Sequence, residues 1–235
     1  MKTTEITPDL IQLTRLGFVN AYLVREQDGF TLIDTTMGKG AAGDLIGAAR
    51  SAGGEIRRIV LTHGHGDHAG GLDAIDRQLG GAAEVYLGEA DARFLAGERV
   101  VEGKVPGMWR DVERKPDVRL SGGERIGSLE AIASPGHTLG HVAFRDTRDG
   151  SVICGDVFTT YGRVTVTNHF YWRFPLAYNA TIDRPQDLRS AQRLRELEPS
   201  RLLAGHGPVV EAPNAGIDAA IARSARAVGE TAGKG

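Results

Sequence analysis

The residues best suited to chemistry lie in one short stretch, in which positions 62–68 read Thr-His-Gly-His-Gly-Asp-His. Imidazole nitrogen and carboxylate oxygen are ligands that divalent metals such as zinc prefer. The whole chain has only 7 histidines, and a solvent-exposed turn has no need of three of them beside an aspartate. The stretch therefore predicts a metal site rather than a surface turn.

Three later positions repeat the same context. His137 lies in Pro-Gly-His-Thr, Asp156 in Cys-Gly-Asp and His206 in Ala-Gly-His-Gly-Pro. Each of them, like His63, follows an apolar segment that is typical of a buried strand and has glycine beside it. Because binding residues in open α/β sheets gather where strands end, we expect these four strand ends to meet at one edge of the sheets.

Strands and helices alternate in the pattern that positions these residues. Gly64 and Gly66 are expected to let the backbone turn tightly enough for the side chains to converge. The apolar pattern predicts strands at 10–14, 18–24, 30–33, 55–61, 84–87, 117–120, 124–126, 129–134, 141–146, 151–154 and 201–204. Helical spacing is expected at 41–52, 71–79, 89–96, 186–197 and 215–228, with a long loop at 97–116 and an irregular stretch at 161–180.

Composition sets the broad class of the protein. A chain of 235 residues without a low-complexity linker is expected to form one α/β domain over 1–235, with two packed sheets covered outside by helices. The 28 basic and 30 acidic side chains give a net charge of −2, so we expect no nucleic-acid or membrane partner. The N-terminus lacks a signal-peptide core, and the one cysteine, Cys154, fits a small buried residue in a cytoplasmic protein.

A family resemblance emerges from four motifs taken in order. Thr62-His63-x-His65-x-Asp67-His68, Gly136-His137-Thr138, Gly155-Asp156 and Gly205-His206-Gly207 together resemble the signature of metallo-β-lactamase-fold hydrolases. The resemblance runs from about Leu32 to Val209. It implies an α/β, four-layer αβ/βα sandwich with a two-metal site along one edge.

The resemblance also implies a ligand set. One metal would bind His63, His65 and His137, and the other would bind Asp67, His68 and His206, with Asp156 bridging the two. Zinc is the expected metal, with iron or manganese as alternatives. Two divalent cations held by two carboxylates would lower the pKa of a bridging water toward neutrality, so that hydroxide becomes the nucleophile.

Three further residues have expected supporting roles. Asp67 could pass a proton to the leaving group in addition to binding metal. Asp34, which follows the strand 30–33, resembles an aspartate that in the family orients a ligand histidine or the bridging group, and its alternative role is to cap a turn. His141 lies in a Gly-His-Thr-x-Gly-His pattern and is expected to contact a ligand or pack beside it rather than bind metal.

The stretch 161–180 is rich in aromatic residues. It is expected to wall the substrate pocket, with burial in a homodimer interface and a satellite hydrophobic cluster as alternatives. The candidate pocket residues are Tyr161, His169, Tyr171 and Trp172.

The substrate class follows from the subgroups that the motifs resemble, which include glyoxalase II and acyl-homoserine lactonases. The sequence after His206 shows no pattern for the helical glutathione-binding domain of glyoxalase II, and Thr159 stands where lactonases carry a tyrosine. Hydrolysis of a small carboxylic ester, thioester or lactone is therefore the expected activity. The rival interpretations are a mononuclear iron enzyme resembling persulfide dioxygenases and a non-catalytic metal-binding module.

Overall fold

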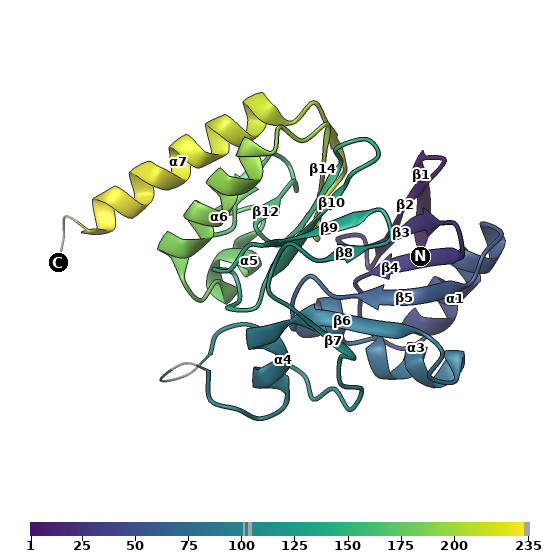
Figure 1. The fold of residues 1–235 in the computed structure, drawn as a ribbon. Coiled ribbons are helices and arrows are strands. Elements are labelled where there is room, and N and C mark those ends of the chain that lie inside the picture. The colour runs from purple at the N-terminus through teal and green to yellow at the C-terminus, as the bar shows by residue number, and fades with distance from the viewer. Residues whose placement is uncertain (101, 103–104, 233–235) are drawn as a thin grey trace. The chain divides into compact units, whose positions relative to one another are not determined.

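The computed structural model describes residues 1–100, 102 and 105–232, and it divides into two compact units (Figure 1). The first unit comprises Met1–Val100 and Met108–Leu120, and the second contains most of the remaining chain, from Ser121 onward. A single domain over 1–235 remains a prediction.

The first unit is built on one mixed sheet. Its strands pair in chain order, and the described residues form β1 (Lys2–Thr7), β2 (Leu10–Arg15), β3 (Val19–Glu26), β4 (Gly29–Ile33), β5 (Ile56–Val60), β6 (Glu84–Gly88) and β7 (Val118–Leu120). The pairs from β1 to β4 are antiparallel, whereas those from β4 to β7 are parallel. Parallel neighbours require crossover connections, which here contain helices.

Those helices close the core of the first unit. They are α1 (Ala41–Ser51), α2 (Gly66–Ala69), α3 (Leu72–Leu79) and α4 (Glu89–Leu95). Leu45 of α1 and Ile75 of α3 belong to one buried cluster with Leu32 of β4 and Ile59 of β5. The apolar faces of α1 and α3 therefore pack against the sheet.

The second unit is built on a sheet of order β15-β14-β11-β10-β9-β8. The strands are β8 (Arg125–Ile126), β9 (Leu129–Ala133), β10 (Val142–Asp146), β11 (Val152–Gly155), β14 (Arg201–Ala204) and β15 (Val210–Glu211), with a separate hairpin of β12 (Phe158–Thr159) and β13 (Thr165–Val166). The helices are α5 (Pro175–Ala180), α6 (Arg184–Glu196) and α7 (Asn214–Ala232). Leu194 of α6 and Ile217 of α7 share a buried cluster with Val152 and Leu202.

Strand direction in this sheet decides where the candidate ligands fall. β10 is antiparallel to both β9 and β11, and β11 is parallel to β14. β9, β11 and β14 therefore run the same way, and their carboxyl ends lie at one edge of the sheet. The segments carrying His137, Asp156 and His206 all follow those ends.

Most of the expected elements are present, and the differences have local causes. The stretch 161–180 is not wholly irregular, because it contains β13 and α5, which are too short to show a period. Helix α6 begins at Arg184, earlier than expected, because the Asp183 side chain accepts a hydrogen bond from the Gln186 amide at 2.9 Å and caps it. Strand β1 and the short helix α2 were not anticipated.

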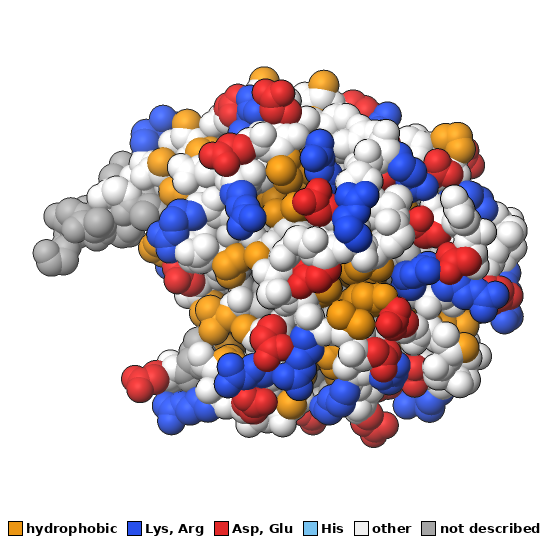
Figure 2. All heavy atoms as spheres, in the orientation of Figure 1, with side chains coloured by type: hydrophobic (Ala, Val, Ile, Leu, Met, Phe, Trp, Pro, Cys, Tyr) orange, Lys and Arg blue, Asp and Glu red, His pale blue; other side chains and the backbone are white. Residues whose placement is uncertain are grey.

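The surface carries no single strong charge on the face that Figure 2 shows, where basic and acidic side chains are intermingled. This distribution agrees with the net charge of −2. Among the described residues, no helix combines the length and the apolar character that crossing a membrane requires.

Candidate metal centre

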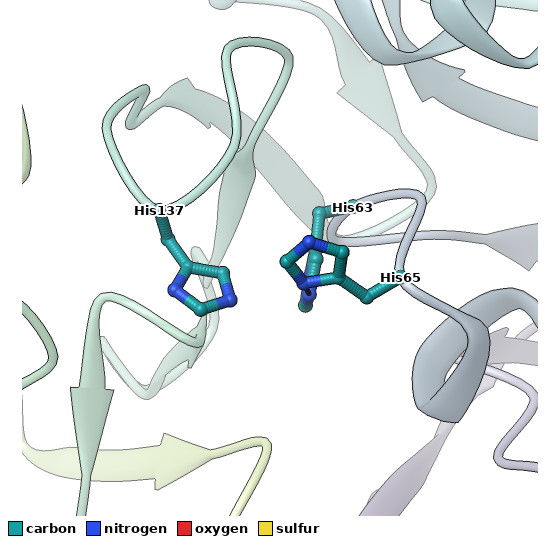
Figure 3. Close-up of side chains that lie close together, drawn as sticks. All are labelled: His63, His65 and His137. Carbon is teal, nitrogen blue, oxygen red and sulfur yellow. Dashed lines mark hydrogen bonds between the residues drawn. The ribbon is translucent and has the colours of Figure 1, made fainter. Parts of the chain in front are cut away.

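The first unit holds four of the expected ligands on the loop after β5 and on α2. The side chains of His63, His65 and His68 are buried. Nε2 of His63 lies 3.1 Å from Nδ1 of His65, and the His63 and His68 ring centroids are 4.1 Å apart. Figure 3 shows the His63 and His65 rings next to one another at this loop. The carboxylate of Asp67 lies 3.7 Å from Nε2 of His68.

Asp34 orients His68. It directly follows β4 with a positive φ of 62°, and its Oδ1 accepts a hydrogen bond from the Thr62 amide at 2.8 Å. Its Oδ2 lies 2.8 Å from Nδ1 of His68. Because a carboxylate only accepts hydrogen bonds, Nδ1 of His68 carries the proton and Nε2 is the nitrogen that can bind a metal. Of the two roles expected for Asp34, the geometry fits the orienting one.

Gly64 and Gly66 lie where neighbouring side chains pack closely on the loop. Neither has a positive φ, so the need for glycine here comes from the space around each Cα. A Cβ on Gly64 would lie 2.6 Å from Cζ3 of Trp109, and one on Gly66 would lie 2.8 Å from Cγ of Arg110. The segment 108–110 therefore packs directly on the ligand loop, and the Gly66 amide donates to the Met108 carbonyl at 2.6 Å.

Two residues, neither of them predicted to contact a ligand or its loop, hold this loop in place. The buried carboxylate of Asp91, in the first turn of α4, accepts a hydrogen bond from the Gly64 amide at 2.9 Å. The Trp109 ring packs edge-on against His65, with centroids 4.9 Å apart. The only sequence signals for them are an acidic residue at a helix start and a tryptophan in a loop, and neither points to a metal site.

In the second unit, Asp156 lies between two histidines. Its Oδ2 is 3.5 Å from Nε2 of His137 and 3.2 Å from Nε2 of His206, and all three side chains are buried. The segment after β9 carries His137 (Figure 3). One carboxylate oxygen thus faces two imidazole nitrogens, as a bridging ligand requires.

His141 supports Asp156 from behind. The Asp156 amide donates a hydrogen bond to Nε2 of His141 at 3.0 Å, and Nδ1 of His141 lies 2.8 Å from Oγ of Ser134. Since Nε2 accepts this hydrogen bond, it carries no proton, so Nδ1–H is the donor to Ser134 and the ring is neutral. This arrangement matches the supporting role expected for His141.

His137 is held by Thr181, the residue that follows α5, a helix that the sequence did not reveal. Oγ1 of Thr181 donates its hydrogen to the Ala177 carbonyl at 2.8 Å. It therefore accepts the hydrogen bond from Nδ1–H of His137 at 3.1 Å. The ring nitrogen left to bind a metal is therefore Nε2, which is also the nitrogen that faces Asp156.

Asp187 of α6 braces the backbone around Asp156 and was also missed. Oγ1 of Thr167 lies 2.6 Å from the Asp156 carbonyl oxygen and 3.0 Å from Oδ2 of Asp187. Complete burial raises the pKa of the Asp187 carboxyl well above its usual range. The backbone at Gly136 packs closely against Asp187, because a Cβ on Gly136 would lie 2.2 Å from the Asp187 amide nitrogen.

The four candidate pocket residues lie in different environments within the second unit. The Tyr161 ring stacks on Phe174 at 5.6 Å, and Phe174 in turn lies 4.7 Å from the His206 ring. Tyr171 is buried, whereas Trp172 is 70% exposed. His169 is half-buried after β13. Of these four residues, Tyr161 is therefore the one whose ring is linked to a candidate ligand, His206, by one intervening ring, that of Phe174.

The donor set suits a borderline divalent metal. His63, His65, Asp67, His68, His137, Asp156 and His206 are each among the histidine and carboxylate side chains that could hold a metal ion. Hydroxyl or carboxylate groups fix Nδ1 of both His68 and His137, which leaves Nε2 of each ring as the metal-binding atom. The residues thus fit the metal chemistry expected of them.

Comparisons with known proteins agree with this arrangement. The model of the metallo-beta-lactamase superfamily matches residues 14–206. The chain is 39% identical over 212 residues to a protein of Bacillus subtilis (strain 168) described as uncharacterized protein YobT, covering 88% of this chain and 90% of that protein. It is 31% identical over 160 residues to a hydroxyacylglutathione hydrolase of Rhodospirillum rubrum, covering 66% of this chain and 54% of that protein.

A solved structure gives the same result for the fold. The metallo-beta-lactamase of Pontibacter korlensis superposes with a TM-score of 0.71 at 20% identity, covering 95% of this chain and 98% of that one. The α/β metallo-β-lactamase fold predicted from the motifs is therefore confirmed.

Proposed function

The chain belongs to the metallo-β-lactamase superfamily, and on that premise we propose that it is a metal-dependent hydrolase acting on a carboxylic ester, thioester or lactone. The observation that carries the proposal is the position of the Asp156 carboxylate, which faces Nε2 of both His137 and His206. A carboxylate that lies between two histidines can bind one metal ion beside each of them, so this position fits two metal ions better than a single ion.

The proposed centre uses seven side chains. His63, His65 and His137 would hold one ion, Asp67, His68 and His206 the other, and Asp156 both. A mononuclear iron centre of His63, His137 and Asp156 would give no role to Asp34, which fixes the proton of His68 at 2.8 Å. The buried Asp34–His68 pair therefore favours the dinuclear hydrolase over the dioxygenase-like alternative. The pair also argues against a non-catalytic metal-binding module, which would not need a second set of oriented metal ligands.

The two ions, with zinc expected, would supply a water molecule of lowered pKa and polarise the substrate carbonyl. The chain's own residues then have defined tasks. Asp34 keeps the proton of His68 on Nδ1, and His141 holds the Asp156 amide so that its carboxylate stays in place. Asp67, whose side chain is 20% exposed, could give a proton to the leaving group.

The substrate is proposed to be a small molecule rather than a nucleic acid or a membrane lipid, because the net charge is only −2. One relative is named a hydroxyacylglutathione hydrolase, which supports including thioesters. Cytoplasmic location and a homodimer remain predictions from the sequence.

A substrate panel tests the proposal. Purified protein would be assayed with lactones, thioesters and aryl esters before chelation, after chelation, and after zinc is restored. We expect hydrolysis of at least one class, its loss on chelation and its recovery with zinc, and no activity in Asp156→Ala. Activity that survives both chelation and Asp156→Ala would contradict a metal-dependent mechanism. An Arg189→Gln variant, altered on the exposed face of α6, is the matched control.

A further inference from the structure

Four basic side chains of the second unit gather around β13, at some distance in sequence from the candidate ligands. Arg163 precedes β13, His169 follows it, and Arg223 and Arg226 lie one turn apart on α7, which packs against β13. We call Arg163, His169, Arg223 and Arg226 the basic cluster. Neither the metal ligands nor the proposed reaction uses any of them.

Specific contacts hold the cluster in position. The Arg163 guanidinium lies over the Tyr171 ring, 4.6 Å from its centroid. Nη2 of Arg223 donates to the Val164 carbonyl at 2.8 Å. These contacts bring the side chain of Arg223 beside the backbone next to Arg163. Two charged groups from distant parts of the chain are thus anchored together.

Polar nitrogens without hydrogen-bond partners lie at the same place. Nε of Arg223 and Nδ1 of His169 are buried and have no hydrogen-bond partner within the described chain. Buried polar nitrogens without partners are costly, and they are normally satisfied by protein, water or a ligand. Arg163 and Arg226 act electrostatically on both of these side chains.

The cluster also lacks acidic partners. No ion pair joins Arg163, Arg223 or Arg226 to a carboxylate among the residues that the structure describes, whereas Arg195 of neighbouring α6 pairs with Asp218 at 2.7 Å. Burial, Arg163 and Arg226 lower the pKa of Arg223. Burial and the three arginines likewise lower the pKa of His169. A bound anion would relieve this repulsion.

We propose that the basic cluster binds a phosphate group of a small molecule. Guanidinium groups present several N–H donors in a planar fork that matches phosphate oxygens. A compact phosphate fits three arginines and a histidine around one short strand, whereas a nucleic acid would call for a longer basic stripe than this near-neutral chain provides.

The phosphate is assigned to the non-reacting end of the substrate, an assignment that rests on the proposed hydrolase function. The ring of Tyr171 lies under the Arg163 guanidinium. The backbone carbonyl of Tyr171 accepts a hydrogen bond from the Phe174 amide at 2.9 Å. The Phe174 ring lies 4.7 Å from that of the candidate ligand His206. One short segment therefore connects the basic cluster to the candidate ligand His206.

Direct binding tests the cluster independently of catalysis. Inorganic phosphate would be titrated calorimetrically into the full-length protein, into Arg163→Gln/Arg226→Gln, and into Arg189→Gln/Arg193→Gln, which removes the same charge from α6. We expect at least a tenfold weaker affinity in the cluster variant and less than a twofold change in the control. Equal affinities in both variants, or no binding by the wild type, would overturn the proposal.

A second variant guards against misfolding. Arg163→Lys/Arg226→Lys keeps both charges and should bind phosphate within about threefold of the wild type, with melting temperatures recorded for every variant. If the glutamine variant unfolds, loss of binding in a folded Arg226→Gln single variant supports the proposal, and its full retention overturns it. A single-stranded oligonucleotide that binds more tightly than phosphate through the cluster would also overturn it.

A matched pair of thioesters, one ending in a phosphate monoester and one in a hydroxyl, shows whether the bound phosphate belongs to the substrate or is free inorganic phosphate. If the substrate carries it, the cluster variant should raise KM for the phosphorylated thioester about tenfold and leave KM for the other unchanged. If free phosphate is the ligand, both KM values stay the same while phosphate binding is still lost. If neither thioester is hydrolysed, the proposed function fails, and the binding titration still decides the cluster.

Discussion

The backbone amide of Asp156 donates a hydrogen bond to Nε2 of His141 at a distance of 3.0 Å. The one ring nitrogen of His141 that could have bound a metal is therefore occupied by the backbone of the proposed bridging ligand. This relationship fits the prediction that a histidine four positions after His137 is not itself a ligand. It also makes the position of the Asp156 carboxylate depend on a neutral, correctly oriented imidazole.

Replacing His141 should weaken metal binding. In His141→Ala the Asp156 amide loses its acceptor, and we expect metal affinity to fall roughly 10–100-fold, as for other residues that orient ligands. Competition with a zinc chelator measures the affinity. His169→Ala, a histidine of the same unit outside the metal centre, is the control. Unchanged zinc affinity in His141→Ala, with only a lower melting temperature, would reduce His141 to a packing residue.

The packing of Trp109 on Gly64 predicts a specific stability effect. In Gly64→Ala the new Cβ would lie 2.6 Å from the indole, and overpacking of this kind costs about 1–3 kcal/mol. Urea unfolding measures the loss. Gly43→Ala is the control, because a Cβ there meets no atom within 4 Å.

A double variant checks the cause of that effect. In a Trp109→Ala background the Gly64→Ala substitution should cost much less, because the clashing ring is gone. Fully additive losses would show that Trp109 is not what requires glycine at position 64.

Cys154 should be chemically silent in the folded protein. Its side chain is fully buried, and burial raises the pKa of the thiol well above its usual range, so almost no thiolate forms at pH 8. Iodoacetamide followed by mass spectrometry should find no alkylation of native protein and full alkylation after unfolding in guanidinium chloride. Rapid labelling of the native protein would contradict the buried position.

His169 should give stability a distinct pH dependence. Burial and then the three arginines depress its pKa below 6.5 in the folded state, so the unfolded chain binds the proton more readily. The contribution of His169 is therefore present above the unfolded pKa and is lost as the pH falls through the folded pKa. Urea unfolding at pH 7.5 and 5 should show a smaller acid loss for His169→Gln than for the wild type.

An NMR titration measures the His169 pKa itself. The resonance missing from His169→Gln identifies the residue, and its pKa should rise when phosphate is added. A pKa at or above 6.5 in the absence of phosphate would show that the arginines do not act on this ring.

The sequence predicted the ligands better than it predicted what holds them. His63, His65, Asp67 and His68 were visible because rare residue types lie within six positions, and His137, Asp156 and His206 because each follows an apolar strand beside a glycine. Asp34 was visible because it directly follows the apolar strand β4, although no glycine lies beside it. These signals are local, so a single sequence carries them.

The supporting contacts could not be predicted because they join residues far apart in the chain. Asp91 reaches Gly64 over 27 positions, and Thr181 reaches His137 over 44. Nothing near either residue in sequence indicates its partner. Helices α2 and α5 have 4 and 6 residues, which is too short for helical periodicity to appear. The basic cluster was hidden in the same way, since it combines residues from two distant segments.

Metal content is the most direct test of the dinuclear hydrolase. Protein purified without added metal would be analysed for metal ions per chain as the wild type, His206→Ala and Asp156→Ala. We predict close to two zinc-like ions in the wild type, about one in His206→Ala, and failure to hold the pair in Asp156→Ala, because removing the shared carboxylate leaves two cations to repel one another. A wild type that reproducibly contains one iron, or an Asp156→Ala variant that keeps two ions, would contradict it.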